Sequence, residues 1–303
     1  MPEGPEVTFM TYELNKRFKG CQLMDFIIHK NSRYFKKAPD GFDTFHKLLD
    51  SCIVRIECIE NKGKFIYWIM EAQTKGKGKG KDKVLTEKII MFNTLGMAGG
   101  WFDTKYNHSD SELNIKCRDS TSPQTLFFND SRHFGTFKFL FESQGAMALL
   151  EKKLKELGPD ILDNKTFTMD VFKKILEKKT LQKKPIGTVI TDQKVISGVG
   201  NYLRAEILYH AKISPHKTIE SFSEKDKETL FHAIVKRSHD SLKAHGATIQ
   251  KYSNLDKSYK HKFKEFNMEV YGKQQTKDGH RVIMEKIGRD TQNTYWCPTI
   301  QKE

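Results

Sequence analysis

The sequence has few cysteines, and those it has are widely spaced. The five cysteines occur without any CxxC pair, at Cys21, Cys52, Cys58, Cys117 and Cys297. An odd number of isolated cysteines argues against a disulfide framework and against a four-cysteine zinc site. We therefore expect no bound metal, no cofactor and a reducing compartment.

The sequence also lacks a long apolar run. No stretch is long and apolar enough to cross a bilayer, and the first residues, MPEGPEV, are acidic and rich in proline, unlike a targeting segment. We therefore expect an intracellular protein that makes no contact with a membrane.

The sequence has fewer acidic than basic residues. Lys plus Arg is 52 and Asp plus Glu is 38 over 303 residues, which gives a net charge of +14. Such a basic protein attracts polyanions, and nucleic acid is the usual partner, although the charge could serve solubility alone. Hydrophobic residues make up 37 % and aromatic residues 11 %, so the chain can bury one large core or two modest ones.

The first half of the sequence predicts β-structure that is opened by a helix. Residues 6–18 place Val7, Met10 and Leu14 on one helical face. Short stretches rich in β-branched and aromatic residues follow at 52–58, 65–70, 88–92 and 126–128. The basic run KGKGKGKDK at 75–83 predicts a flexible loop between two strands, with a loose phosphate contact as the alternative.

The second half predicts helices and then a hairpin. Apolar residues recur at helical spacing in 147–157, 170–176, 201–211 and 225–244. The turn LGPD at 157–160 is a plausible domain boundary, and the polar, lysine-rich segment 250–266 predicts a long loop. Two β-rich stretches around Gly279 predict a terminal hairpin.

The N-terminal residues Pro2 and Glu3 can carry chemistry. Methionine before a small residue is normally removed, and this would expose the Pro2 amine, whose pKa of about 7.7–8.0 leaves part of it neutral near pH 7. A neutral amine can attack C1′ of a nucleoside and form a Schiff base, while Glu3 moves protons. The alternative is that the two residues only begin a helix favourably.

The motif ISGVGNYL can bind a phosphate. Glycines such as Gly200 at a helix start let the backbone approach closely, the helix N-terminus favours negative charge, and Asn201 adds a donor. Lys64, at the edge of an apolar strand, could place an ammonium group on another phosphate. An ordinary capped turn and a solvated lysine are the alternatives.

Two further motifs contain side chains suited to a gap in a duplex. LGMAG carries Met97, and DSRHFG carries Arg132 and Phe134. Such side chains could wedge into DNA where a base has left, although Met and Phe are more often part of a core.

In this order, these motifs resemble the formamidopyrimidine-DNA glycosylase and endonuclease VIII family. The resemblance runs from Pro2 to about residue 301 and is most specific in MPEGPEV, LGMAG, DSRHFG and DQKVISGVGNYLRAEILYHAKISP. It implies that Pro2 is the Schiff-base nucleophile, that Glu3 protonates the opening deoxyribose and that Glu6 supports the site. It also implies that the remaining residues contact damaged DNA: Lys64, Asn201 and Gly200 at phosphates, and Met97, Arg132 and Phe134 in the gap.

Two features resemble one branch of that family. Gly4 resembles the endonuclease VIII branch, which favours oxidised pyrimidines. The tail contains one cysteine, Cys297, where most members hold zinc, so it resembles the zincless finger of some eukaryotic and giant-virus enzymes. In the family a finger arginine binds the lesion phosphate. Arg289 is our choice, and Arg281 is the alternative.

The resemblance implies an α+β fold in three parts. These are an N-terminal β-sandwich opened by a helix (1–145), a helical domain with a helix–two-turn–helix module (146–266) and a C-terminal β-hairpin or zincless finger (267–303). We expect a monomer that acts on damaged double- or single-stranded DNA, wherever the DNA is. The expected activity is bifunctional: removal of oxidised bases through a Pro2 Schiff base, then strand cleavage by β,δ-elimination. The alternatives are an 8-oxoguanine/formamidopyrimidine glycosylase and a non-catalytic protein that binds damaged DNA.

Overall fold

The computed structural model describes residues 2–74, 86–118, 120–247, 266–288 and 292–302. These residues form two compact units. The first contains Pro2 and residues 7–155, and the second contains Glu3–Glu6, residues 156–247 and the described residues from 266 onward. The three-domain division at residues 145 and 266 stays a prediction.

The first unit is built on an eight-stranded antiparallel sheet. In sheet order its strands are β5 (Gly100–Phe102), β7 (Gln124–Asn129), β6 (Ser109–Lys116), β1 (Gln22–Ile28), β2 (Cys52–Lys62), β3 (Phe65–Thr74), β4 (Thr86–Thr94) and β8 (Thr136–Phe141). All four stretches predicted as β lie in these strands. The last pair of residues between strands β3 and β4 is Gln73 with Thr86. The basic run 75–83, predicted as a loop between two strands, follows β3 in the sequence and lies outside the described residues.

The sheet folds over on itself. Strands β1 and β8 are four positions apart in the sheet, which would separate them by roughly 19 Å if the sheet were flat. The rings of Phe26 in β1 and Phe137 in β8 nevertheless have centroids 5.3 Å apart, and those of Trp68 in β3 and Trp101 in β5 are 5.6 Å apart. The two halves of one sheet therefore enclose an aromatic core between them, and the predicted β-sandwich is confirmed.

Two helices precede the long strands of the first unit, and the earlier one belongs to that unit from Val7 onward. Helix α1 (Gly4–Phe18) buries Val7, Met10 and Leu14 completely, as their spacing predicts. Helix α2 (Phe42–Ser51) was not predicted, because the first half was interpreted as β-structure. The apolar pair Phe45 and Leu49, four residues apart and both buried, is the signal that would have found it.

A disulfide joins Cys21 and Cys117, contrary to what the isolated cysteines suggested. The two residues are 96 apart in the sequence, so their spacing gave no sign of a bond. Strands β1 and β6 are antiparallel neighbours with Gln22 opposite Lys116, and this register brings the two flanking cysteines face to face. The cysteine pattern therefore gives no argument for a reducing compartment.

Most of the remaining helices belong to the second unit, as predicted. They are α4 (Met169–Leu176), α5 (Ile186–Val189), α6 (Asn201–Ala211) and α7 (Glu224–Lys243), with short 3-10 helices η2 (Lys179–Leu181) and η3 (Ile219–Ser221). Helix η1 (Glu142–Gln144) and all but the last residue of α3 (Ala146–Glu156) lie in the first unit. None of the helices in the described ranges is long and apolar enough to cross a membrane.

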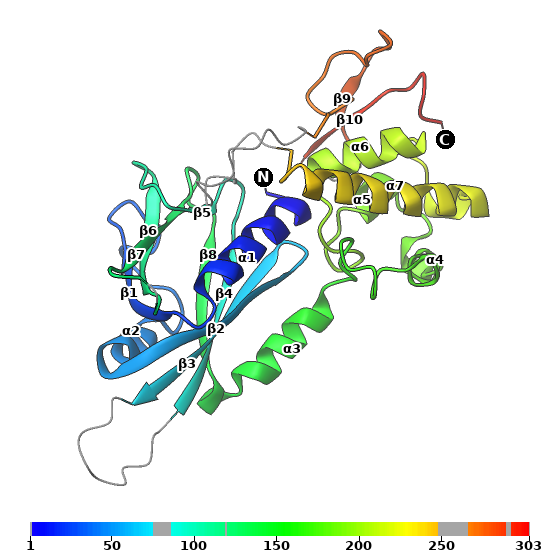
Figure 1. The fold of residues 1–303 in the computed structure, drawn as a ribbon. Helices are drawn as coiled ribbons and strands as arrows, with labels where there is room; N and C mark the ends of the chain where they lie inside the picture. Colours follow the sequence, from blue (N-terminus) through cyan, green and yellow to red (C-terminus); the bar gives the residue numbers. More distant parts are fainter. Residues whose placement is uncertain (1, 75–85, 119, 248–265, 289–291, 303) are drawn as a thin grey trace. The chain divides into compact units, whose positions relative to one another are not determined.

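The second unit ends in the predicted β-hairpin. Strands β9 (Ile283–Lys286) and β10 (Asn293–Trp296) pair antiparallel and lie side by side in Figure 1. Their connection is at 287–292 rather than at Gly279, so the position predicted for the turn is wrong. Gly279 has a φ of 80° and belongs to a separate small turn closed by a bridge between Gln275 and Arg281.

Candidate active site

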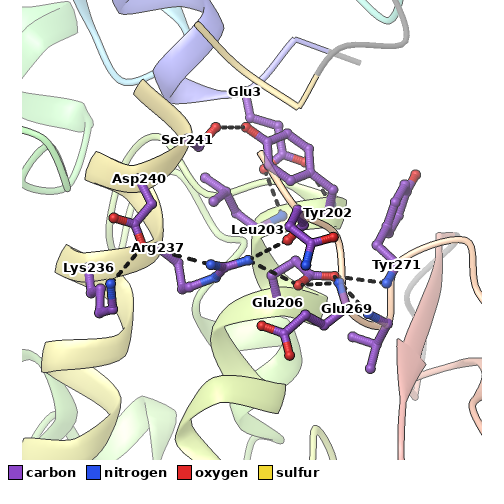
Figure 2. Close-up of polar contacts among 12 residues, drawn as sticks. Glu3, Tyr202, Leu203, Glu206, Lys236, Arg237, Asp240, Ser241, Glu269 and Tyr271 are labelled. Carbon is purple, nitrogen blue, oxygen red and sulfur yellow. Dashed lines mark hydrogen bonds and ion pairs between the residues drawn. The ribbon is translucent and has the colours of Figure 1, made fainter. Parts of the chain in front are cut away.

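The carboxylate of Glu3 is bound at the start of α6. Its oxygens accept hydrogen bonds from the amides of Tyr202 (2.8 Å) and Leu203 (3.2 Å), which Figure 2 labels, and from the amide of Gly200 (2.7 Å). The residue is 1 % exposed. The first amides of a helix have no partner within the helix, and the helix dipole attracts an anion there. Glu3 supplies that anion, and the three donors compensate for the burial of its charge.

The glycine-rich turn before α6 approaches the N-terminal segment closely. The amide of Gly4 donates to the carbonyl oxygen of Gly198 at 2.8 Å, and a Cβ on Gly4 would lie 2.9 Å from the Gly198 Cα. We expected the amides of this turn to receive a DNA phosphate. In the structure the Gly200 amide donates to Glu3, and the DNA contact predicted for Gly200 stays a prediction.

Glu6 forms a second buried carboxyl site. One oxygen accepts from the Glu3 amide (3.0 Å) and from the Tyr202 hydroxyl (3.0 Å), and the other accepts from the Ala247 amide (2.8 Å). A Cβ on Gly246, which has a φ of 97°, would lie 2.4 Å from the Glu6 Cγ. Glu6 therefore ties the first turn of α1 to α6 and to the end of the segment that follows α7.

Burial shifts the pKa values of Glu6 and of its partner Tyr202. It raises the pKa of the Glu6 carboxyl, and the hydrogen bonds that favour the charged form offset only part of that effect. Burial, together with the nearby Glu6 and Glu3, raises the pKa of the Tyr202 phenol well above its usual value. Tyr202 also pairs with Ser241 of α7 at 2.9 Å (Figure 2), so its hydroxyl links helices α6 and α7 to Glu6.

Lys64 lies in the turn between β2 and β3. Lys62 pairs with Phe65, which leaves Gly63 and Lys64 as a two-residue hairpin turn. The Asn61 side-chain amide donates to the Gly63 carbonyl oxygen (3.1 Å) and to the Thr8 hydroxyl on α1 (3.0 Å). The turn that carries Lys64 is therefore fixed against the helix that begins two residues after Pro2.

Met97, Arg132 and Phe134 come together on one surface of the first unit. An Arg132 Nη1 lies 3.4 Å from the Met97 sulfur, and Phe134 is 54 % exposed. A Cβ on Gly96, whose φ is 59°, would lie 2.6 Å from the Phe134 carbonyl carbon, so the two loops pack backbone to backbone. We call these three side chains the wedge surface. Their predicted role in DNA stays a prediction.

Asp130 organises the loop that carries Arg132 and Phe134. Its buried carboxylate accepts from the amides of Arg132 (3.1 Å) and Gly135 (2.7 Å). His133, held at a φ of 55°, pairs through Nδ1 with Asp110 at 2.5 Å, and burial raises the pKa of the Asp110 carboxyl. We did not single out these acids from the sequence. Asp130 is the first residue of the DSRHFG motif. Because Asp often binds backbone amides a few residues further on in a turn, its position could have predicted this role.

The predicted phosphate-binding residues are spread over different parts of the chain. Lys64 lies in the first unit, and Asn201 is the first residue of α6 in the second. Arg289 lies outside the described residues. Arg281, the alternative finger arginine, is exposed at the bridge with Gln275. The convergence of these residues on one nucleotide stays a prediction.

Cys297 is the one cysteine of the tail that could bind a metal. Cys297 is completely buried in an apolar cluster with Ala205 and Tyr209 of α6 and with Val270 and Val282. Among the residues that the structure describes, no group of three or more His, Cys, Asp or Glu side chains could hold a metal ion.

Two family models match this chain. The N-terminal domain of formamidopyrimidine-DNA glycosylase matches residues 1–137, and the H2TH domain of formamidopyrimidine-DNA glycosylase matches residues 157–253. Among curated proteins, the formamidopyrimidine-DNA glycosylase of Lactococcus lactis subsp. cremoris is 27 % identical over 304 residues, covering 100 % of both chains. That of Ureaplasma parvum is 26 % identical over 317 residues, covering 99 % of this chain and 100 % of the relative.

Solved structures share the fold. A Lactococcus lactis Fpg in complex with Fapy-dG-containing DNA has a TM-score of 0.76 at 24 % identity, with both chains fully covered. The wild-type Lactococcus lactis Fpg in complex with DNA that contains an oxidised pyrimidine has a TM-score of 0.74 at 22 % identity, again with full coverage. The α+β fold predicted from the sequence is therefore confirmed.

Proposed function

Because this chain belongs to the formamidopyrimidine-DNA glycosylase family, we propose that it removes damaged bases from DNA with its own N-terminal proline. It is a DNA glycosylase with lyase activity at abasic sites, and its partner is damaged DNA. The net charge of +14 suits a polyanionic partner.

The reaction starts from the Pro2 amine, which is free once Met1 is removed. The nitrogen lone pair attacks C1′, the bond from C1′ to the base breaks, and the sugar ring opens as it is protonated, leaving a cationic Schiff base. Loss of a C2′ proton expels the 3′ phosphate (β-elimination). Loss of a C4′ proton then expels the 5′ phosphate (δ-elimination). The Glu3 carboxylate takes the proton that the Pro2 nitrogen loses and delivers it to O4′ of the deoxyribose, and the base leaves as an anion that takes a proton from water.

The observation that carries this proposal is the anchored Glu3. Its carboxylate is fixed by three amides of the α6 start, and Pro2 is the residue directly before it. The amine is therefore one peptide unit from a carboxyl group of fixed position. A carboxyl group held at a fixed position beside the amine is what proton transfer during Schiff-base formation needs.

DNA binding would use two groups of side chains. Lys64, Asn201, Gly200 and the finger arginine, Arg289 with Arg281 as alternative, contact phosphates beside the lesion. The wedge surface fills the space left by the extruded base, and its exposed Phe134 suits stacking against bases.

The lesion class is a separate part of the proposal. We favour oxidised pyrimidines, on the basis of Gly4 in the MPEGPE motif. The second candidate class is 8-oxoguanine and formamidopyrimidine lesions, because the curated relatives are named for formamidopyrimidine. A panel of duplexes, each with one lesion, separates the two. Faster excision of 8-oxoguanine than of any oxidised pyrimidine would reverse our preference.

We also propose that the hairpin of β9 and β10 works as a finger without zinc. The single tail cysteine, Cys297, is buried among apolar side chains that need no metal. Elemental analysis should find less than about 0.1 zinc per chain. One zinc per chain would overturn this assignment and would direct attention to Cys297 with His280.

Borohydride trapping tests the activity. Incubation with a duplex that contains an abasic site, followed by reduction, should give a covalent complex whose peptide map places the DNA on Pro2. The cleaved product should carry phosphate at both ends of the gap. Binding without any trapped complex would instead support a non-catalytic protein. Trapping on a lysine would remove Pro2 from the mechanism.

A further inference from the structure

Arg204 is a fully buried arginine one turn after Asn201 on α6. It is 0 % exposed, which is rare for arginine. Its Nη2 donates to the side-chain oxygen of Asn201 at 2.5 Å. A guanidinium group can only donate hydrogen bonds, so the atom of Asn201 that faces it must be the carbonyl oxygen. The amide nitrogen of Asn201 therefore points away from Arg204.

Tyr271 lies on the other side of the Asn201 side chain. Burial raises the pKa of its phenol, and a hydrogen bond with the Asn201 side chain acts in the opposite direction. Because the Asn201 oxygen faces Arg204, the Asn201 nitrogen is the atom left to face Tyr271. That nitrogen carries two N–H donors, so it can contact Tyr271 with one and an anion with the other.

Arg204 and Tyr271 are themselves held in place. Nη2 of Arg204 lies 3.2 Å from the carbonyl oxygen of Asn293 at the start of β10, and Nη1 lies 3.5 Å from that of Gly187 in α5. The backbone amide of Tyr271 donates to the buried carboxylate of Glu206 at 2.9 Å (Figure 2). The orientation of the Asn201 amide is therefore built into the packing of α6 against the start of the hairpin.

We propose that Arg204 is a positioning residue, which turns the Asn201 amide so that its N–H donors face a phosphate of bound DNA. The inference rests on the proposed function, in which Asn201 contacts a phosphate beside the lesion. An asparagine that could rotate freely would present its oxygen to the phosphate part of the time and would bind less well. Arg204 makes the side chain a pure donor towards the DNA.

The first test compares Asn201→Asp with Asn201→Ala. Asp has the shape of Asn but presents only oxygens. If Arg204 faces the oxygen, Asn201→Asp keeps or strengthens that contact, so its thermal midpoint should equal or exceed that of the wild type. Asn201→Ala loses the contact and should melt several degrees lower. Affinity for a duplex with a tetrahydrofuran abasic analogue should fall about 10-fold for Asn201→Ala and further for Asn201→Asp, whose carboxylate repels the phosphate.

An Asn201→Asp variant that melts below Asn201→Ala would overturn the proposal, because it would mean that the amide nitrogen faces inward. Wild-type affinity in Asn201→Asp would overturn it as well. The order of the three thermal midpoints is measured without DNA. It therefore tests the orientation even if the wild type proves not to bind DNA or not to be trapped, and those two results would count against the proposed function instead.

The second test is a double-mutant cycle between Arg204→Met and Asn201→Ala. Each single variant should weaken binding of the same duplex about 10-fold, and Asn201→Ala should leave the salt slope unchanged, because a neutral amide releases no counterion from the DNA. The double variant should bind no worse than Asn201→Ala, because Arg204 acts through Asn201. A purely structural arginine would instead give an additive loss of about 100-fold, and that result would overturn the proposal. If Arg204→Met does not fold, the thermal midpoints of Asn201→Asp and Asn201→Ala still test whether the Asn201 oxygen faces Arg204.

Discussion

The two carboxylates near the N-terminus, Glu3 and Glu6, are 1 % and 3 % exposed, whereas Phe134 of the wedge surface is 54 % exposed. Each buried carboxylate accepts at least three hydrogen bonds, mostly from backbone amides. The loops of the wedge surface pack backbone to backbone, Arg132 and Phe134 are exposed, and Arg132 contacts the half-buried Met97. Chemistry on a covalent bond needs fixed groups, and intercalation needs side chains that are free to enter DNA.

This comparison predicts different kinds of damage. A change at the buried carboxylates should alter both the stability and the chemistry, because donors lose their partners. A change at the wedge surface should alter DNA recognition and leave stability almost unchanged.

The largest effect is expected when the N-terminal amine is blocked. Insertion of Glu between Met1 and Pro2 prevents methionine removal and places the proline nitrogen in a peptide bond. Borohydride trapping and base excision should both fall at least about 1,000-fold, while affinity for abasic-analogue DNA should change much less. Mass spectrometry verifies the N-terminus. Trapping at the wild-type rate would show that another amine is the nucleophile.

Glu3→Gln comes next. The new amide nitrogen would face the amide donors of α6, so the free energy of unfolding should fall by about 2–3 kcal/mol. Base excision should fall about 100-fold, and cleavage of a preformed abasic site should fall less, since only excision needs the base to leave as the sugar is protonated. Single-turnover kinetics on both substrates measure this. The control is Glu13→Gln, a change of a buried acid in the middle of α1. Equal losses on the two substrates would contradict the assigned role.

Glu6→Gln should change the pH dependence of stability. The folded-state pKa of Glu6 is raised above 4.5 by burial, so the folded protein holds a proton that the unfolded chain releases. That contribution is fully present below about pH 4.5 and is lost as the pH rises through the raised value, with a limiting slope of about 1.4 kcal/mol per pH unit. Denaturant titrations from pH 4.5 to 8 should show the decline in the wild type but not in the variant. Parallel profiles would refute the prediction.

The smallest of these effects is expected at Arg132. Arg132→Ala should slow excision about fivefold on a duplex and hardly at all on a single strand, because only a duplex has an orphaned partner base to hold. The thermal midpoint should stay within about 1 °C, since the side chain is outside the core. Arg118→Ala removes an exposed arginine after β6 and serves as the matched control. Equal losses on both substrates would show that Arg132 is not a wedge.

Local sequence patterns predicted much of the fold. The three-to-four spacing of Val7, Met10 and Leu14 predicted α1, and residues 201–211 are the observed α6. Both follow from side-chain periodicity, which depends on neighbours in the chain. Helix α2 was missed, although its Phe45 and Leu49 carry the same kind of signal, because β-rich surroundings dominated the interpretation.

The site could be predicted as a set of residues but not as a set of contacts. The motifs pointed to Glu3, Glu6, Asn201 and the wedge surface by residue type. They gave no sign that the amides at the α6 start donate to Glu3, or that Arg204 sets the orientation of Asn201. The contacts of Glu3 join residues about 200 positions apart and depend on how the chain closes, which a pattern of neighbours does not contain. Arg204 and Asn201 are three residues apart on one helix, so their spacing was a usable signal that the sequence interpretation missed.

By itself, the sequence determined the charge of the protein, the period of its main helices and strands and the identity of the residues that can do chemistry. The tertiary structure decided which of these residues meet. Strand register joined Cys21 to Cys117, and the folding-over of the sheet brought Phe26 to Phe137. The helix dipole at the start of α6 was matched with the carboxylate of Glu3. Periodicity is a local property of the chain, whereas register, sheet curvature and the partner of a helix end are fixed by contacts distant in sequence.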